Sequence, residues 1–350
     1  MIRENIQSLV EGSSLSCQES RQAMHEILAG QATSSQIAAF LTAMRMKGET
    51  VEELVAFAQV MRENCLRIHP RVKGRLVDTC GTGGDSLKTF NISTASAFVV
   101  AGVGVSIAKH GNRSVTSKSG SADVLEHLGL NLSMKPEAVK EAIEQVGIGF
   151  MFAPAFHPAM KFAVVPRKEM GIRTVFNILG PLTNPACANA QLLGVYDAKL
   201  TAPMAQALRS LGVEEAMVVH GLNGMDEIST LGKTAISHLK NGEVSNFEVS
   251  PEYLGVNHAQ LQELLGGTPE ENAQTLVKIL NGYWAHADAK TEIVLANSAA
   301  GLVVGGKAEN LKEGLEVARE SIRSGAAYEK LKALVKFSGG DASKLEELEK

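Results

Sequence analysis

The spacing of apolar residues changes once along the chain. Up to about residue 69 the apolar residues recur at helical spacing, and four of them share one face of a predicted helix: Ile37, Phe40, Leu41 and Met44. Three pairs fit capping boxes at the starts of predicted helices: Ser16 with Glu19, Thr33 with Gln36, and Thr50 with Glu53. The pattern therefore predicts a small bundle made of helices only.

From about residue 75 short apolar strands alternate with helical segments. The predicted strands are 75–79, 103–108, 148–153, 191–196 and 216–220, and the predicted helices include 94–102, 121–129, 135–147, 201–212 and 291–304. Asn241-Gly242, a dipeptide typical of hairpin turns, separates two further strand-like stretches. This alternation predicts an α/β fold with a mostly parallel central sheet flanked by helices.

The segment from about residue 160 to 185 interrupts the alternation, because it is crowded with proline, glycine and asparagine. We expect it to cross back to the helical bundle. The chain then divides into a small helical domain, residues 1–69 plus about 160–185, and a large α/β domain, residues 70–159 and 186–350. The active site is expected in the cleft between the two domains.

Composition narrows the possible partners. The chain has 350 residues, 45% of them hydrophobic, which is enough for a large core and two domains. Its net charge of −4 and its 5% of aromatic residues argue against nucleic-acid binding. The four cysteines form no C-x-x-C pair, so neither a zinc knuckle nor a redox pair is indicated.

No membrane or export signal is visible in the sequence. The N-terminal residues lack the apolar core of a signal peptide. The longest run of small and apolar residues, 95–108, is too short to span a bilayer. We therefore expect a protein of the reducing cytoplasm with no membrane partner.

The stretch VDTCGTGGDSLKTFNIST, residues 77–94, ends a predicted strand in a cluster of glycines. Glycines let backbone amides approach an anion, and the start of the following helix presents further donors. The spacing fits neither the dinucleotide-binding fingerprint, which needs a third glycine, nor the P-loop, where Leu87 replaces the second glycine. Capping of the helix by Asn91 or Ser93 is an alternative that stays open.

Two more strand ends are polar. After the second strand, Lys109, Arg113 and Lys118 supply positive charge, and His110 offers a flat ring. After the fifth strand come Asp226 and Glu227, and paired carboxylates with substrate phosphates suit Mg²⁺, although adjacent acids are also common on surfaces. Since ligands bind beyond the carboxyl ends of strands in open α/β sheets, the three ends predict one site.

The chemistry of this site points to transfer of a phosphorylated sugar. G-x-S-x-G and H-E-x-x-H are absent, so we expect no protein nucleophile among the catalytic residues. Mg²⁺ and the positive charges of Lys109, Arg113 and Lys118 would neutralise a pyrophosphate leaving group. The sugar carbon would pass through an oxocarbenium-like state.

Six strings together carry a resemblance: GTGGD, NIST, KHGNRSVTSKSGSADVLEHLG, FAPAFHPAMK, VPRKEMGIRTVFNILGPLTNP and GMDEIS. They resemble the bacterial anthranilate phosphoribosyltransferases of tryptophan biosynthesis, and the likeness covers nearly the whole chain. It implies a nucleoside phosphorylase-like phosphoribosyltransferase fold and a homodimer joined through the helical parts. It also implies that anthranilate and phosphoribosyl pyrophosphate are the substrates, with Mg²⁺ as cofactor.

The resemblance also implies a role for each matching position. The donor, phosphoribosyl pyrophosphate, would contact Gly81, Gly84, Asp85, Thr89, Asn91, Ile92, Ser93, Thr94, Lys109, His110, Gly111, Asn112, Arg113, Ser114, Val115, Thr116, Ser117 and Ser121. Anthranilate would contact Gly81, Asn112 and Arg167, with Arg167 facing its carboxylate and with His110 and His157 lining its path. The metal ligands would be Ser93, Asp226 and Glu227.

Two alternative functions remain open from the sequence. A pyrimidine nucleoside phosphorylase-like enzyme shares the fold and a similar phosphate loop, but it should need no Mg²⁺-binding carboxylate pair, so Asp226 and Glu227 argue against it. A homologue could instead act on another arylamine or bind nucleic acid. The acidic pI near 6.2 opposes nucleic acid, and Arg167 favours an aromatic carboxylate.

Overall fold

The N-terminal part of the protein is a bundle of four helices. The computed structural model describes residues 1–84, 87–114, 118–283 and 288–349. The bundle consists of α1 (Ile2–Val10), α2 (Cys17–Leu28), α3 (Ser34–Lys47) and α4 (Val51–Glu63). All three expected capping boxes are present at the starts of α2, α3 and α4. The bundle core is apolar, and in it Phe40 and Phe57 meet edge to face with ring centroids 6.1 Å apart.

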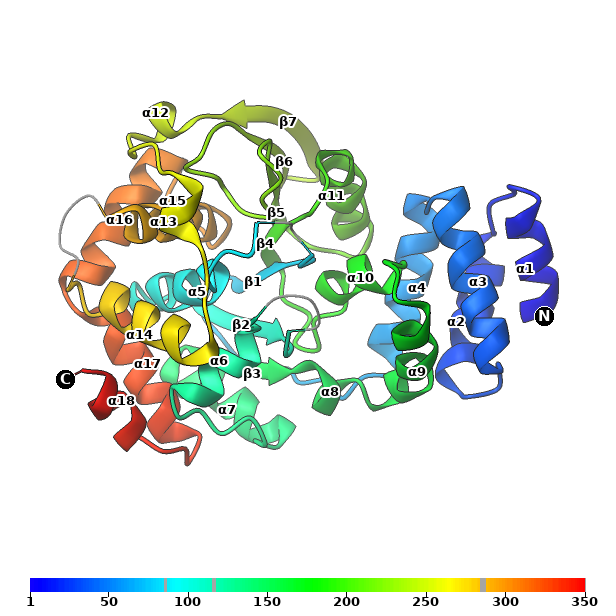
Figure 1. Cartoon of the computed structure of the whole chain (residues 1–350), viewed down its shortest axis with the longest axis horizontal. Coiled ribbons are helices and arrows are strands. Elements are labelled where there is room, and N and C mark those ends of the chain that lie inside the picture. Colours follow the sequence, from blue (N-terminus) through cyan, green and yellow to red (C-terminus); the bar gives the residue numbers. More distant parts are fainter. Residues whose placement is uncertain (85–86, 115–117, 284–287, 350) are drawn as a thin grey trace.

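The larger part is built on a seven-stranded sheet in the order β3-β2-β1-β4-β5-β6-β7 (Figure 1). The strands are β1 (Leu76–Gly81), β2 (Ser106–Gly111), β3 (Ile148–Phe152), β4 (Ala190–Gly194), β5 (Glu215–Gly221), β6 (Thr234–Lys240) and β7 (Glu243–Val249). The first five strands are parallel, and β6 and β7 add an antiparallel edge. Asn241 and Gly242 both have positive φ, as the predicted hairpin turn requires.

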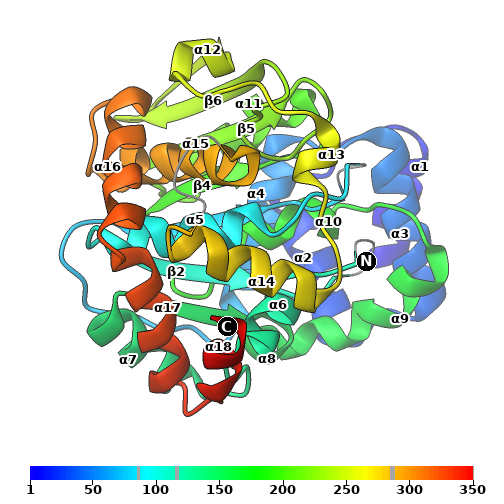
Figure 2. The same ribbon diagram turned by 60° about the vertical axis from the view of Figure 1, so that its left-hand side comes forward.

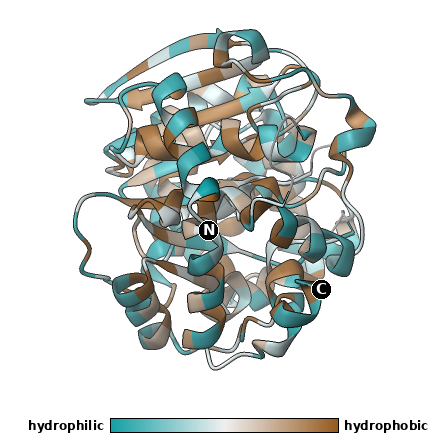
Figure 3. Ribbon diagram, turned by 90° about the vertical axis from the view of Figure 1, so that its left-hand side faces the viewer, coloured by the Kyte–Doolittle hydropathy of each residue, from teal (hydrophilic) through white to brown (hydrophobic). Residues whose placement is uncertain are grey.

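Helices cover both faces of the sheet, which confirms the predicted α/β class. On one face α5 (Ile92–Gly102) and α15 (Ala289–Val304) pack against each other, with α14 (Pro269–Leu280), α16 (Leu311–Arg323) and α17 (Ala326–Phe337) around them (Figure 2). The other face carries α7 (Pro136–Val146) and α11 (Thr201–Ser210). Figure 3 shows apolar residues concentrated in the strands, whereas the peripheral helices alternate between apolar and polar positions.

Short helices complete the chain. They are α6 (Ser121–His127), α8 (Ala153–Phe156), α9 (Lys161–Met170), α10 (Phe176–Leu179), α12 (Pro251–Leu254), α13 (Leu261–Leu264) and α18 (Ser343–Leu348), with 3-10 turns at Pro158–Met160, Gly180–Leu182 and Ala198–Leu200. Within the described residues, no helix combines the length and apolar character needed to cross a membrane.

The segment that interrupts the alternation does return to the bundle. Its helix α9 packs against α3 and α2, and the ring of Phe162 lies against the backbone of Gly30. Val175, Phe176 and Leu179 belong to the same apolar cluster as the bundle core. The expected contact is therefore present, whereas the division into two domains at the stated bounds stays a prediction.

The predicted bounds of the second strand are wrong. It was expected at 103–108, but β2 runs from Ser106 to Gly111 and pairs with β3 up to the partners Gly111 and Phe152. The physical reason lies in the turn after α5, where Gly104 has a positive φ of 84° and delays the start of the strand. Lys109 and His110 therefore belong to the sheet and not to the loop that follows it.

Candidate active site

The three polar strand ends predicted from the sequence meet at one edge of the sheet. The strands β2, β1, β4 and β5 are parallel neighbours, so their carboxyl ends lie side by side. The backbone amide of Gly83, after β1, donates to Asp226 Oδ2, after β5, at 3.1 Å. Gly194 at the end of β4 lies under Asp226 so closely that a Cβ there would overlap the Asp226 carbonyl oxygen. The first and third polar loops are thus in direct contact.

Lys109 is a buried cation at this edge, and only 3% of it is exposed. Its Nζ donates to the carbonyl oxygen of Thr79 at 2.5 Å and to Ser93 Oγ at 3.3 Å. Burial lowers the pKa of Lys109, and the negative charges of Asp78 and Glu227 oppose that shift. A residue of β2 therefore joins β1 to the first turn of α5 and places a positive charge between them.

Asp78 is a fully buried carboxylate that the sequence reasoning missed. Its Oδ1 accepts from the His110 amide at 3.3 Å, and its Oδ2 accepts from Asn184 Nδ2 at 2.8 Å. The same Asn184 group also donates to the Ala108 carbonyl oxygen at 2.8 Å. Burial raises the pKa of Asp78 to about 6, against the effect of Lys109. An acidic residue within an otherwise apolar strand was the available signal.

The start of α5 is held by its neighbours. Asn91 occupies the N-cap position but makes no capping hydrogen bond with its side chain. Its Nδ2 donates to the Ser119 carbonyl oxygen at 3.2 Å, and its Oδ1 accepts from Asn272 Nδ2 at 2.9 Å. The open alternative that Asn91 merely caps the helix therefore fails. Thr94 Oγ1 is buried and has no hydrogen-bond partner among the described residues.

The glycine loop adopts conformations that suit glycine. Gly83 and Gly84 have φ values of 63° and 80°, which other residues rarely adopt. The Arg173 guanidinium donates to the Gly84 carbonyl oxygen and lies over the Tyr196 ring, 4.5 Å from its centroid. The sequence reasoning missed Arg173, although it lies in the same basic segment as Arg167. Asp85 lies outside the described residues.

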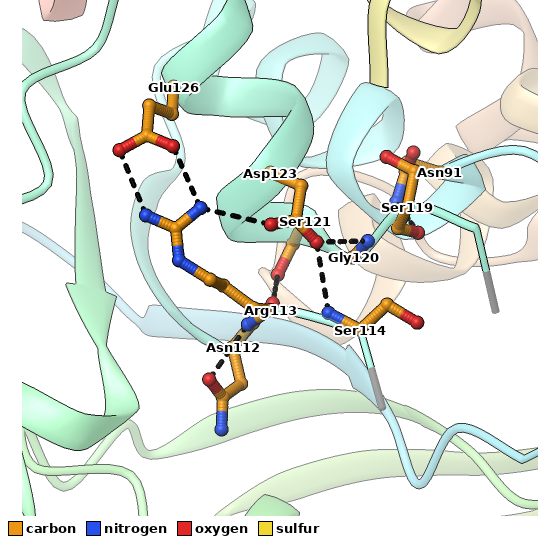
Figure 4. Close-up of polar contacts among 9 residues, drawn as sticks. All are labelled: Asn91, Asn112, Arg113, Ser114, Ser119, Gly120, Ser121, Asp123 and Glu126. Atoms are coloured by element: carbon orange, nitrogen blue, oxygen red, sulfur yellow. Dashed lines mark hydrogen bonds and ion pairs between the residues drawn. The ribbon is translucent and has the colours of Figure 1, made fainter. Parts of the chain in front are cut away.

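The second loop is anchored to α6 (Figure 4). The Arg113 guanidinium pairs with Asp123 at 3.0 Å and Glu126 at 2.7 Å and lies 5.6 Å from the centroid of the Phe152 ring. Ser121 Oγ donates to the Asn112 carbonyl oxygen at 3.3 Å. Arg113 is thus already paired, and its expected contact with the donor stays a prediction. The expected contacts of Val115, Thr116 and Ser117 fall outside the described residues.

A cavity of about 170 Å³ lies between the first and second loops. It is lined by Lys88, Thr89, Lys118, Ser119, Leu265, Gly266, Gly267 and Asn272. Its two lysines suit an anion, whereas the amides of Gly266 and Gly267 already donate to the Lys88 carbonyl oxygen and to Asn272 Oδ1.

Two buried histidine rings lie side by side, and an arginine on α9 lies over a phenylalanine ring. The rings of His110 and His157 lie 5.1 Å apart between centroids. Burial lowers the pKa of His110 to about 3 and that of His157 to about 4, so both are neutral at pH 7. Arg167, on α9, lies with its guanidinium carbon 5.2 Å from the centroid of the Phe176 ring. Burial lowers the pKa of Arg167, and no acidic group among the described residues contributes to the shift.

The carboxylate pair offers only part of a metal site. Asp226 is fixed by the Gly83 amide, and the charge of Glu227 acts on Lys109. Across the described ranges, no group of three or more His, Cys, Asp or Glu side chains could hold a metal ion. Two carboxylates with a hydroxyl such as that of Ser93 form an all-oxygen set, which suits Mg²⁺ when phosphates complete the coordination.

Comparisons with known families and proteins cover almost the whole chain. The glycosyl transferase family matches with its helical bundle domain at residues 3–65 and with its a/b domain at residues 73–328. The anthranilate phosphoribosyltransferase of Acetivibrio thermocellus is 53% identical over 338 residues, which is 97% of each chain. That of Petrotoga mobilis is 51% identical over 338 residues, again 97% of each chain.

Solved structures agree with these relatives. The anthranilate phosphoribosyltransferase from Thermus thermophilus superimposes with a TM-score of 0.90 and 41% identity, covering 96% of this chain and 99% of that one. The enzyme from Saccharomyces cerevisiae in complex with PRPP and Mg gives a TM-score of 0.89 and 30% identity, covering 97% of this chain and 98% of that one.

The two buried histidines predict a loss of stability in acid. Their folded pKa values, about 3 and about 4, lie below the unfolded value, so the unfolded chain binds more protons as the pH falls below about 6.5. Their contribution to stability is full above that pH and falls by roughly 2 kcal/mol per histidine by pH 5. Denaturant unfolding between pH 7.5 and pH 5 measures the change.

A double variant, His110→Gln with His157→Gln, should lose less stability over this range than the parent protein. The exposed His69→Gln is the matched control and should follow the parent. A double variant whose stability declines as steeply as the parent's would contradict the burial argument.

Proposed function

The chain belongs to the family of anthranilate phosphoribosyltransferases, and we propose that it transfers the phosphoribosyl group of 5-phosphoribosyl 1-pyrophosphate to the amino group of anthranilate. The products are N-(5-phosphoribosyl)anthranilate and pyrophosphate, which places the enzyme in tryptophan biosynthesis. One observation carries the proposal. The glycine loop, the buried Lys109 and the carboxylate pair of Asp226 and Glu227 converge at one edge of the sheet.

The donor is proposed to lie between the glycine loop and the first turn of α5. Gly83 and Gly84 have positive φ there, so the backbone of the loop turns without side chains in the way, and Lys109 Nζ donates to Ser93 Oγ. As the bond between the ribose carbon and pyrophosphate breaks, negative charge grows on the leaving oxygen. Because Lys109 is already desolvated and fixed, its charge stabilises that oxygen without reorganisation.

Mg²⁺ is proposed as the cofactor of this chain. Ser93, Asp226 and Glu227 would hold it together with oxygens of the donor, which agrees with their all-oxygen chemistry. Bound Mg²⁺ supplies positive charge to the pyrophosphate oxygens. The Gly83 amide keeps the Asp226 carboxylate oriented toward the glycine loop.

Anthranilate is proposed to lie against the rings of His110 and His157, within reach of Arg167. Arg167 would pair with its carboxylate through two parallel hydrogen bonds, and Gly81 and Asn112 would line the same position. The neutral rings of His110 and His157 would form an apolar path for the aromatic ring. The amino nitrogen then attacks the ribose carbon, which carries positive charge as the pyrophosphate leaves, and loses one proton.

We further propose that the protein is a cytoplasmic homodimer joined through the helical domain, residues 1–69 plus about 160–185. Exposed apolar side chains on that domain support the contact, among them Met46 at 83%, Val164 at 53% and Val165 at 54% exposure. The acidic balance of charges supports the absence of a nucleic-acid partner. The active site would lie in the cleft between this domain and the α/β domain.

The activity is tested by the fluorescence of anthranilate. Mixing the protein with anthranilate, phosphoribosyl pyrophosphate and Mg²⁺ should make the fluorescence decay, because the amino group becomes substituted. A chelator should stop the decay. No decay with the full mixture, or decay with inorganic phosphate and a nucleoside instead of the donor, would refute the proposed reaction.

The proposed metal ligands predict a joint effect on Mg²⁺ dependence. Replacing Asp226 and Glu227 together with Ala should remove most activity and shift the Mg²⁺ titration to higher concentrations, because both carboxylates are lost. The control is the same double replacement of Glu346 and Glu347, two exposed acids that are neighbours in the sequence, and it should leave the Mg²⁺ titration unchanged. An unchanged titration in the first double variant would sink the assignment of the metal ligands.

Arg167 predicts a separation of the two substrates. Loss of a charge-assisted hydrogen bond costs about 1.5–3 kcal/mol, or roughly ten- to hundredfold in affinity. Arg167→Ala should therefore raise KM for anthranilate by about that factor and leave KM for the donor nearly unchanged. Arg167→Lys should be intermediate, because an ammonium group cannot copy the two parallel bonds.

The exposed neighbour Lys168→Ala is the control for this variant, and steady-state kinetics in both substrates is the measurement. Aniline, which lacks the carboxylate, should be used equally poorly by the parent and by Arg167→Ala. A rise in KM for the donor with KM for anthranilate unchanged would mean that Arg167 binds the donor and that the two substrate positions are assigned the wrong way round.

A further inference from the structure

One carboxylate closes the loop between β2 and α6. We call residues 112–120 the basic loop, of which the structure describes 112–114 and 118–120. At one end of this loop the Ser114 amide donates to Asp123 Oδ2 at 3.0 Å, and at the other end the Gly120 amide donates to the same oxygen at 2.9 Å (Figure 4). The second oxygen, Oδ1, accepts from Arg113 Nη1 at 3.0 Å. Asp123 therefore binds both ends of the basic loop at once.

The environment of Asp123 favours its charged form. Its side chain is 18% exposed, so partial burial raises its pKa. The amides of Ser114 and Gly120 and the Arg113 guanidinium together outweigh burial and hold the pKa below its ordinary value. At neutral pH the contact is therefore between a carboxylate and three donors, which is the strong kind of hydrogen bond.

The two ends of the basic loop also abut each other. A Cβ at Gly120 would overlap the Ser114 amide nitrogen and lie 2.7 Å from the Asn112 carbonyl oxygen. That carbonyl oxygen in turn accepts from the Ala122 amide at 3.1 Å. The two loop ends therefore pack directly against each other, and the Asp123 carboxylate accepts from both.

One end of the basic loop also contacts the start of α5. The Ser119 carbonyl oxygen, next to Gly120, accepts from Asn91 Nδ2 at 3.2 Å. We propose that Asp123 is a positioning residue for the phosphorylated donor, holding Ser114 and Gly120 together so that these two ends of the basic loop and the first turn of α5 face one ligand. This inference rests on the proposed function, because the donor is what the two elements would share.

Glu126 provides the matched comparison. It pairs with Arg113 as Asp123 does, at 2.7 and 2.9 Å, but it accepts no backbone amide of the basic loop. Glu126 is 49% exposed, and ion pairs at such positions contribute little. If Asp123 acts only as a partner of Arg113, removing either carboxylate has the same effect. If it closes the loop, only the change at Asp123 matters.

The experiment compares Asp123→Ala with Glu126→Ala in the full chain by steady-state kinetics. Alanine at 123 removes the one oxygen that accepts from both Ser114 and Gly120, whereas asparagine could keep it. We expect KM for phosphoribosyl pyrophosphate to rise about tenfold in Asp123→Ala, as loss of a charge-assisted bond implies. KM for anthranilate and kcat should change by less than about twofold, and Glu126→Ala should change all constants by less than about twofold.

Hydrogen exchange in the ligand-free protein gives a second measurement. A peptide that contains Gly120 should exchange faster in Asp123→Ala than in the parent and in Glu126→Ala. Equal exchange in all three proteins overturns the proposal, as does an equal rise of the donor KM in both variants or of both KM values in Asp123→Ala. If the parent does not consume the donor, the proposed function fails, and the exchange comparison still decides whether Asp123 closes the loop.

Discussion

The site depends on one buried ammonium group. Lys109 has lost nearly all its water, and an isolated charge in that position would be expensive. The Thr79 carbonyl and the Ser93 hydroxyl take two of its hydrogen bonds, and the charges of Asp78 and Glu227 balance its own. These partners come from β1, α5 and the loop after β5. Satisfying one charge thus holds together the strand ends that form the site.

Local rules predicted much of this architecture. Capping boxes and the hairpin turn were found because each depends on residues only a few positions apart. The meeting of three strand ends followed from the parallel sheet, because parallel strands align their carboxyl ends. The bounds of β2 were not found, because Gly104 belongs to the turn after α5 and because the far end of the strand depends on pairing with β3, which is distant in the sequence. For the same reason the acids that hold Arg113 and the contact of Arg173 with the glycine loop were invisible before folding.

The segment between β3 and β4 links the bundle to the site. Its helix α9 packs on α3 and carries Arg167. A few residues later Arg173 holds the Gly84 carbonyl, and Asn184 binds the buried Asp78. One stretch of chain therefore contacts the helical bundle, the glycine loop and the interior of the sheet. A shift of the bundle relative to the sheet would therefore move both Arg167 and the residues that hold the glycine loop.

Gly194 shows how narrow the sequence choice is at one position. Its backbone lies against the Asp226 carbonyl with no space for a Cβ. Any base substitution that changes a glycine codon to that of another amino acid introduces at least a Cβ. Every missense mutation of this codon therefore displaces the loop that carries Asp226 and Glu227, whatever the chemistry of the new side chain. In a saturation library, Gly194 should accept no replacement, whereas the exposed neighbour Asp197 has no such steric limit.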